Sequence, residues 1–467
     1  MAESIAHQVN ISANAERSAH KLNEVVARIE RLPASGWQVR ARLVVGIATF
    51  FDAFDALAIA YILPTLIRPW GLTPGQIGLA ISIGYVGQLV GALLSGWLAE
   101  RYGRMNIAVL NVIIFSLFSL LLATSWNFGA LLIFRSIQGI GLGGEVPIAA
   151  TYISEITKAK GRGKFVLFYE LVFPLGLMGA ALAGFWIVPH WGWRWLFVLG
   201  GISSLLVFYM RFRLPESPRW LASVGRLDEA EKAMAFIEEK VQQSSGVSLE
   251  LPTEIVDVSA TKPTRFGELF SNTYRTRTVV AWVIWFSAYL ATYGLTTWLP
   301  SIYTSVYRLP LSQALMYSLG TTAAGFVGAF ICALLIDRVG RRFWISFASI
   351  VAGVLLLVLW FLSKPTALEV LIWSALAYTF TSSVSLTVYL YTPELYPTRM
   401  RALGSSVASA WLRVASIIGP LIVATILAQY ALVWVFLIFG VVSIIGGIIA
   451  AFFATETRER VLEEVSP

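Results

Sequence analysis

The chain has 467 residues, of which 57% are hydrophobic and only 13% are charged. Soluble domains carry about 25% charged residues, so this composition excludes a chain that mostly faces water. The net charge of +8 comes from basic residues placed between long apolar runs, which favours a membrane over a nucleic acid as the partner of this basic chain.

The first segment, residues 1–42, is polar and contains no apolar core of a signal peptide. The first membrane helix is therefore expected to act as its own insertion signal. Within this segment, residues 21–32 have an amphipathic pattern, which predicts a helix that lies against the cytoplasmic membrane surface. A partly ordered tail is the alternative for the same residues.

Twelve apolar runs follow, each long enough to cross a bilayer core of about 30 Å, which takes ~20 helical residues. Backbone groups in lipid must bond within the segment, so each run is predicted to be a helix. A β-barrel would instead show alternating segments of ~10 residues. The runs cover residues 43–66, 76–99, 106–124, 128–152, 164–188, 193–213, 276–300, 312–336, 343–362, 367–391, 402–427 and 432–454.

The runs form two groups of six, which predicts an all-α membrane protein of twelve transmembrane helices in two pseudo-symmetric halves. The halves are 43–213 and 276–454; between them lies a polar linker, 214–275, and a tail follows at 455–467. Residues 227–243 of the linker have helical apolar spacing. Most arginines and lysines fall in the loops on one side, so the positive-inside rule puts that side, the linker and both termini in the cytoplasm.

Two loop motifs recur in both halves. An acid-Arg-x-Gly-Arg pattern appears after the second and the eighth run, and a glutamate followed seven residues later by arginine appears after the fourth and the tenth. The copies lie 237 and 239 residues apart, which indicates duplicated six-helix halves. We expect these residues and an acid and an arginine after the sixth run to form ion pairs that close the cytoplasmic side; setting the topology alone is the simpler alternative. The gate residues are Glu100, Arg101, Arg104, Glu155, Arg162, Glu216, Arg219, Asp337, Arg338, Arg341, Glu394 and Arg401.

These motifs resemble the major facilitator superfamily over nearly the whole chain. Arg135-Ser-Ile-Gln138-Gly139 in the fourth run and Pro215-Glu216-Ser217-Pro218-Arg219-Trp220 after the sixth support this, and the latter is shared with the sugar porters. Arg31-Leu32-Pro33 followed by Phe50-Phe51-Asp52-Ala53-Phe54-Asp55 is similar to the niacin transporters, the aromatic-acid/proton symporters and the synaptic-vesicle-protein branch. The resemblance implies alternating-access transport and a proton site at Asp55, with Arg135 facing it.

Ionisable residues at bilayer depth are costly and are therefore candidates for function. Asp52 and Asp55 share one face of the first helix, and an Asp55–Arg135 pair is expected to be the proton switch; a static buried pair is the alternative. Glu145 serves a proton path or a packing role. Glu170 stands where sugar porters carry a sugar-binding glutamine.

The substrate candidates are mostly aromatic. Arg413 in the eleventh run is suited to grip a carboxylate, with pairing to a buried acid as the alternative. The seventh and tenth runs present tyrosines and serines, whereas the amides that sugar porters use in the seventh run are missing. The proposed substrate-binding residues are Arg413, Tyr289, Tyr293, Tyr378, Tyr389, Gln138, Glu170, Trp411 and Ser382.

The sequence therefore predicts a monomeric, proton-coupled carrier of a small organic acid such as nicotinate, located in a bacterial inner membrane. A sugar or polyol porter and a receptor-like relative that no longer transports are the alternatives. An enzyme would need a nucleophile–base pair or metal ligands, and neither is visible. The single cysteine, Cys332, excludes an internal disulfide, and three scattered histidines predict neither a metal site nor a cofactor.

Overall fold

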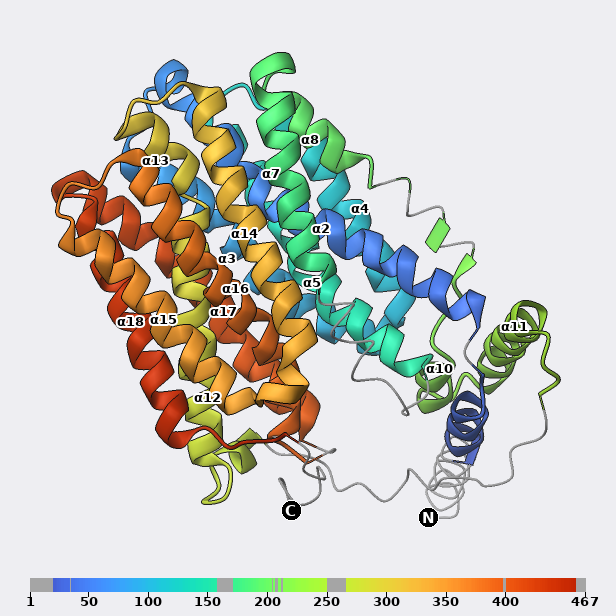
Figure 1. Cartoon of the computed structure of the whole chain (residues 1–467). Helices are drawn as coiled ribbons and strands as arrows, with labels where there is room; N and C mark the ends of the chain where they lie inside the picture. The colour runs from blue at the N-terminus through green and yellow to red at the C-terminus, as the bar shows by residue number, and fades with distance from the viewer. Residues whose placement is uncertain are drawn as a thin grey trace, which may run out of the picture.

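The computed structural model describes residues 20–33, 35–157, 171–203, 205, 209–210, 213–249, 266–397 and 400–458, and these residues contain helices but no strands. The helices pack side by side in two bundles, coloured blue to green and yellow to red in Figure 1. Their bounds are α2 Gly36–Trp70, α3 Pro74–Tyr102, α4 Arg104–Ala123, α5 Phe128–Glu155, α7 Val172–Trp191, α8 Arg194–Gly201, α10 Pro218–Ser223, α11 Leu227–Ser245, η1 Phe266–Phe270, α12 Arg275–Thr296, α13 Leu299–Ser305, α14 Leu311–Val339, α15 Arg341–Phe361, α16 Ala367–Glu394, α17 Arg401–Gln429 and α18 Val433–Phe453.

Ten helices in the described part are long and apolar enough to cross a membrane. These helices correspond to ten of the twelve predicted spans, with boundaries shifted by a few residues. The other two predicted spans correspond to α5 and α8. α5 has 28 residues but carries Arg135 and Glu145, and α8 has only eight residues. The seventh predicted span is interrupted after Thr296, because Pro300, the second residue of α13, has no N–H to bond back to Thr296 and continue the helix.

The two bundles repeat one packing scheme. In the N-terminal half α3 and α4 pack on α5, and α2 packs on α7; in the C-terminal half α14 and α15 pack on α16, and α12 packs on α17. Contacts between the halves follow the same symmetry, because α3 meets α17 and α7 meets α14. The duplication predicted from the loop motifs is thus present in the helix packing.

A glutamate at the end of each half caps a helix in the same manner. The Glu216 carboxylate accepts hydrogen bonds from the first backbone N–H groups of α4, and Glu456 accepts them from Arg341 and Arg342 at the start of α15, at 2.9 and 3.0 Å. Negative charge is favourable there because the first N–H groups of a helix have no partner within it. Glu456 is a third repeated position, which the sequence analysis missed.

The amphipathic N-terminal segment forms a helix over residues 20–30, but its predicted place on the membrane surface is wrong. Its apolar residues Val25 and Ile29 are fully buried in a core that they share with Met234 and Ile237 of α11. The predicted linker helix α11 thus receives the apolar face that was expected to meet lipid. Arg28 adds a hydrogen bond to the Glu238 carboxylate at 2.6 Å.

Candidate functional site

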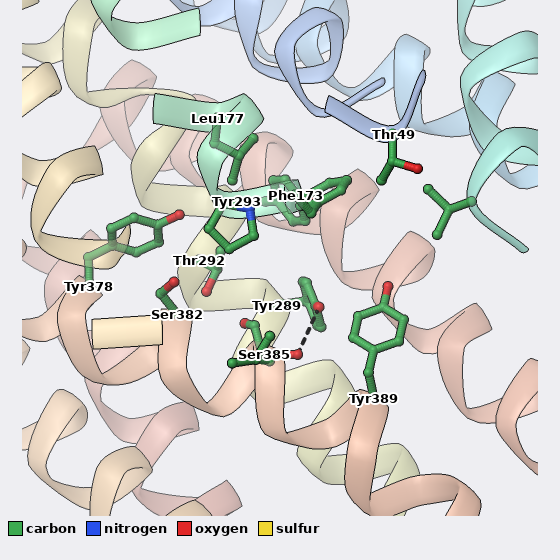
Figure 2. A pocket seen from close by; sticks show the side chains of 13 residues that line it. Thr49, Phe173, Leu177, Tyr289, Thr292, Tyr293, Tyr378, Ser382, Ser385 and Tyr389 are labelled. Carbon is green, nitrogen blue, oxygen red and sulfur yellow. Dashed lines mark hydrogen bonds between the residues drawn. The ribbon is translucent and has the colours of Figure 1, made fainter. Parts of the chain in front are cut away.

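A cavity of about 570 Å³ lies between the two halves. Figure 2 shows its wall, in which aromatic rings and hydroxyl groups from both halves face one another. The lining residues are Thr49, Val146, Phe173, Pro174, Leu177, Tyr289, Thr292, Tyr293, Tyr378, Ser382, Ser385, Leu386 and Tyr389. They come from α2, α5 and α7 on one side and from α12 and α16 on the other.

A stack of rings along α12 forms one side of the cavity. Tyr289 lies parallel to Trp285 and to Tyr293, with ring centroids 5.5 and 5.7 Å apart. These residues are spaced by four, so they fall on one helix face. The other two aromatic residues of this helix, Trp282 and Phe286, turn away from the cavity and contact Trp411 of α17.

The polar face predicted on α16 supplies the adjoining part of the same wall. Tyr378, Ser382, Ser385 and Tyr389 all line the cavity. The Tyr289 hydroxyl donates to the backbone carbonyl of Ser385 at 3.2 Å, which connects α12 to α16 beside the cavity. The wall therefore combines flat apolar surfaces with hydroxyl groups, a composition that suits a small ring with one polar substituent.

Seven lining residues were not anticipated from the sequence. Phe173, Pro174 and Leu177 of α7 carry no polar atom in their side chains, and nothing in the sequence separates them from lipid-facing residues. Thr49 lies three residues before Asp52, on the same polar face of α2, and this spacing was the one available signal. The others are Val146, Thr292 and Leu386.

Arg413 does not line the cavity. Its guanidinium donates a hydrogen bond of 2.6 Å to Gln88 Oε1, which joins α17 of the C-terminal half to α3 of the N-terminal half. It also interacts electrostatically with Asp52. Trp411, predicted to contact the substrate, packs against Trp282 instead, with centroids 5.5 Å apart. Among the proposed substrate residues, Glu170 lies outside the described residues.

Arg135 contacts Asp55 through the backbone rather than through the carboxylate. Its guanidinium donates to the carbonyl oxygens of Asp55 and Ala56, at 2.9 and 2.8 Å, and to Gln138 Oε1 at 2.6 Å. Gln138 is thereby engaged by Arg135 and is not part of the cavity wall. The Asp55 carboxylate accepts a hydrogen bond from Ser119 at 3.1 Å.

Three buried carboxyl groups gather next to these arginines. Asp52, Asp55 and Glu145 are each at most 4% exposed. One oxygen of Asp52 and one of Asp55 are buried without a hydrogen-bond partner in the structure. Glu145 accepts from the Thr49 hydroxyl at 3.3 Å, and Thr49 lines the cavity, so this acid lies one side chain away from the cavity space.

The predicted gate residues pair within each half. Arg104 binds Glu155 at 3.3 Å in the N-terminal half, and Arg341 binds Asp337 at 2.9 Å and Glu394 at 3.3 Å in the C-terminal half. These pairs therefore connect helices of one bundle rather than the two bundles.

The other gate residues have separate roles. Arg101 lies over the rings of Trp97 and Tyr102, and Arg219 pairs with Glu30 at 3.4 Å. The backbone carbonyl groups of Glu100 and Arg338 accept hydrogen bonds from Trp220 and Arg458. Arg401 donates to the carbonyl of Pro393, and Arg162 is outside the described residues.

Comparisons with known proteins agree with this architecture. The sequence profile of the family described as "Sugar (and other) transporter" matches residues 33–467. The chain is 32% identical over 443 residues to the niacin transporter NiaP of Acinetobacter baylyi, covering 95% of this chain and 99% of that protein. It is also 32% identical over 412 residues to the 4-hydroxybenzoate transporter PcaK of that organism, covering 86% and 88%.

Solved structures share the same fold. A partially occluded inward-open conformation of the xylose transporter XylE from E. coli superposes with a TM-score of 0.70 at 18% identity, covering 91% of this chain and 100% of that one. The same transporter bound to 6-bromo-6-deoxy-D-glucose gives a TM-score of 0.66 at 19% identity, covering 92% and 98%. At this identity the likeness concerns the fold alone.

Proposed function

The chain belongs to the sugar (and other) transporter family of the major facilitator superfamily, and from this we propose that it imports a small aromatic carboxylate together with protons. It is a multi-pass membrane transporter rather than an enzyme. The observation that carries the proposed substrate is the cavity wall of Tyr289, Tyr293, Tyr378 and Tyr389. Flat rings pack well on such faces, and hydroxyl groups orient one polar substituent.

The functions that two relatives are named for agree with this choice. One relative is named as a transporter of niacin and the other of 4-hydroxybenzoate, and both substrates are small rings with a carboxyl group. For the present chain we propose the same class, with nicotinate as the first candidate. Bacterial relatives make the inner membrane of a bacterium the proposed location, with both termini in the cytoplasm.

Transport by alternating access fits the contacts between the halves. Ser82 donates to the carbonyl of Ile417 at 2.8 Å, and Tyr61 bonds Thr322 at 3.2 Å, both far from the linker end of these helices. We infer an arrangement that is closed on the outer side and faces the cytoplasm.

Proton coupling is proposed for Asp52, Asp55 and Glu145. All three acids are buried at bilayer depth, where an ionised carboxylate is costly and a protonated one is favoured. Asp55 is the first candidate, because its carboxylate has one unpartnered oxygen and belongs to a residue that Arg135 already grips through its backbone.

The alternative of a sugar or polyol porter is less well supported by the cavity. Among the described lining residues there is no asparagine or glutamine to bind sugar hydroxyl groups. A receptor-like relative would have little reason to keep the ion pairs Arg104–Glu155 and Arg341–Glu394 in both halves.

Uptake into proteoliposomes tests the proposal. Uptake of radiolabelled nicotinate or 4-hydroxybenzoate should rise with an inward proton gradient, and Asp55→Asn should weaken this dependence. Tyr293→Ala should lower uptake at least tenfold, since a stacked ring is lost from the wall. Equal uptake with and without the gradient would remove proton coupling, and uptake of xylose but of no aromatic acid would favour the sugar alternative.

A further inference from the structure

The described wall of the cavity is neutral. Its 13 residues include hydroxyl groups, aromatic rings and aliphatic side chains, but no aspartate, glutamate, lysine or arginine. The wall therefore offers hydrogen bonds to a ligand and no countercharge to a carboxylate.

The two arginines near the cavity, one buried and one half-buried, donate hydrogen bonds to groups outside the wall. Arg135 donates to two backbone carbonyl oxygens and to Gln138, and it is fully buried. Arg413 donates to Gln88 and reaches the cavity only electrostatically, through its effect on Tyr293. Neither guanidinium belongs to the described wall, so a ligand in the cavity meets no guanidinium there.

An acid lies directly behind the described wall. Glu145 bonds Thr49 from behind the wall, and Asp52 and Asp55 lie further along the same buried network. Near the cavity there are thus three carboxyl groups and two arginines; Arg413 donates to Gln88, and Arg135 has three hydrogen bonds, with Nε unpartnered. An ionised ligand would leave water for a place without a cation and beside an acid, and such a group changes its protonation state instead.

Unused hydroxyl groups of the wall suit a neutral polar group. Thr292 Oγ1 is buried without a hydrogen-bond partner, and its residue lines the cavity from α12. Ser382 lies nearby on α16, as Figure 2 shows. A hydroxyl both donates and accepts, so it matches a protonated carboxyl group or a carboxamide equally well.

We propose that the cavity binds its aromatic acid in the neutral, protonated form, so that a proton travels on the carboxyl group of the ligand itself. This inference rests on the proposed function and deepens it by naming the charge state of the substrate. It also makes the uncharged amide of the same ring a ligand. Acid and amide present nearly the same shape to the wall and differ mainly in whether a proton must be taken up.

Binding of matched acids and amides to the purified full-length protein tests this inference. The probes are benzoate, benzamide, and a ring-substituted benzoate whose carboxyl pKa is about one unit lower, with its own amide. Between about pH 5.5 and 8.5 the Kd of each acid should rise about tenfold per pH unit, while the Kd of each amide stays constant. Relative to its amide, the stronger acid should bind about tenfold more weakly at any fixed pH.

The dependence on ligand pKa separates ligand protonation from titration of the protein. A pH-independent Kd for both acids, with no binding of the amides, would overturn the inference while leaving an aromatic-acid transporter intact. If neither nicotinate, benzoate, 4-hydroxybenzoate nor any amide binds, the proposed function is wrong and the inference falls with it.

Substitutions at Thr292 and Arg413 test which of these residues recognises the ligand. Thr292→Val should weaken acid and amide alike by about three- to tenfold, since one neutral hydrogen bond is lost from both. Thr296→Val is the matched control, because Thr296 lies one turn further along α12, bonds the Thr292 carbonyl at 2.7 Å and is not part of the wall.

Arg413→Gln should leave the ratio of acid to amide affinity unchanged. A selective loss of acid binding of about 30-fold or more in this variant would assign the carboxylate to Arg413 and overturn the inference.

Discussion

Small residues leave the space in which the buried charges of the N-terminal half lie. A methyl group on Gly84 of α3 would lie 2.6 Å from Arg135 Nε, so only glycine lets the guanidinium cross this helix. Gly200 of α8 lies in the same way against the Asp55 carboxylate. The two glycines therefore fix where the proposed proton site and its arginine are held.

Gly200→Ala tests this arrangement. The added methyl group would overlap Asp55 Oδ1 and lie 2.8 Å from Ser119 Oγ, so the Ser119–Asp55 hydrogen bond cannot persist unchanged. We expect a loss of about 1–3 kcal/mol in stability and a loss of proton-driven uptake. Thermal melting of the purified protein measures the first. Gly96→Ala on α3 is the control, because no atom lies within 4 Å of its added group; equal melting of the two variants would contradict the described position of Asp55.

Sequence reasoning found the charged residues of the site but not their partners. Charges within apolar runs are rare and stand out, so Asp55, Arg135 and Arg413 were identified directly. The acceptors of Arg135 are backbone carbonyl groups, which every residue has and which no sequence pattern marks. Gln88, the partner of Arg413, is an ordinary polar residue 325 positions away, and only the packing of α3 on α17 brings the two together.

At the scale of elements, the N-terminal helix (residues 20–30) and α11 are held together by ion pairs and apolar contacts, an interface that we call the clasp. The Arg28 guanidinium donates to Glu231 and Glu238, and Arg31 also donates to Glu238. Burial opposes ionisation of Glu238, but the hydrogen bonds from Arg28 and Arg31 outweigh it and hold the pKa of this carboxyl below its ordinary value of 4.5. The clasp gives a role to the Arg31-Leu32-Pro33 motif, whose arginine pairs with the linker and whose leucine is buried.

Hydrogen exchange of residues 21–32 tests the clasp. An acid with a lowered pKa in the folded state stabilises that state fully above its unfolded value of about 4.5, and this contribution is lost as pH falls through the folded pKa. The helix should therefore stay docked at neutral pH and loosen below about pH 4. Glu238→Gln should speed exchange about tenfold at neutral pH.

The neighbouring Glu239 supplies the control for this experiment. Its side chain is 60% exposed and contacts Lys240 and Gln243 of its own helix. Glu239→Gln should therefore leave exchange in residues 21–32 unchanged. If both variants exchange alike, or if Glu238→Gln exchanges at the rate of the unaltered protein, the N-terminal helix is not held by these ion pairs.

Most helices could be predicted, because a span of ~20 apolar residues leaves few alternatives in a bilayer. The N-terminal helix was predicted correctly as a helix, but the surface that it packs against was predicted wrongly. An amphipathic face specifies that something apolar covers it, and both a membrane and α11 satisfy that condition. Only the matching face of α11, with Met234 and Ile237, decides between them.

For the whole molecule, the contacts that α3 makes with the C-terminal half lie in the middle and outer parts of this helix. Gln88, Tyr85 and Ser82 of α3 all touch the C-terminal half, and Gly78, nearer the outer end, lies against Ala424 of α17. The doubled motifs predicted two similar halves, but the same halves fit together in several arrangements. The arrangement observed depends on contacts whose partners lie hundreds of residues apart, and it was out of reach of the sequence.

A wedge at Gly78 tests whether closure of the outer side is part of the transport cycle. A Cβ on Gly78 would lie 2.6 Å from Ala424 Cβ and 3.2 Å from the Pro420 carbonyl, so a tryptophan there forces α3 away from α17. Gly78→Trp should abolish uptake by holding the outer side open, while the cavity wall, which contains no residue of α3, still binds ligand with a Kd changed less than about tenfold. Gly75→Trp, on the same helix and 3.9 Å from Thr73 alone, should transport normally. Uptake retained in Gly78→Trp would show that this contact does not have to form, and the inward-facing assignment would then lose its main support.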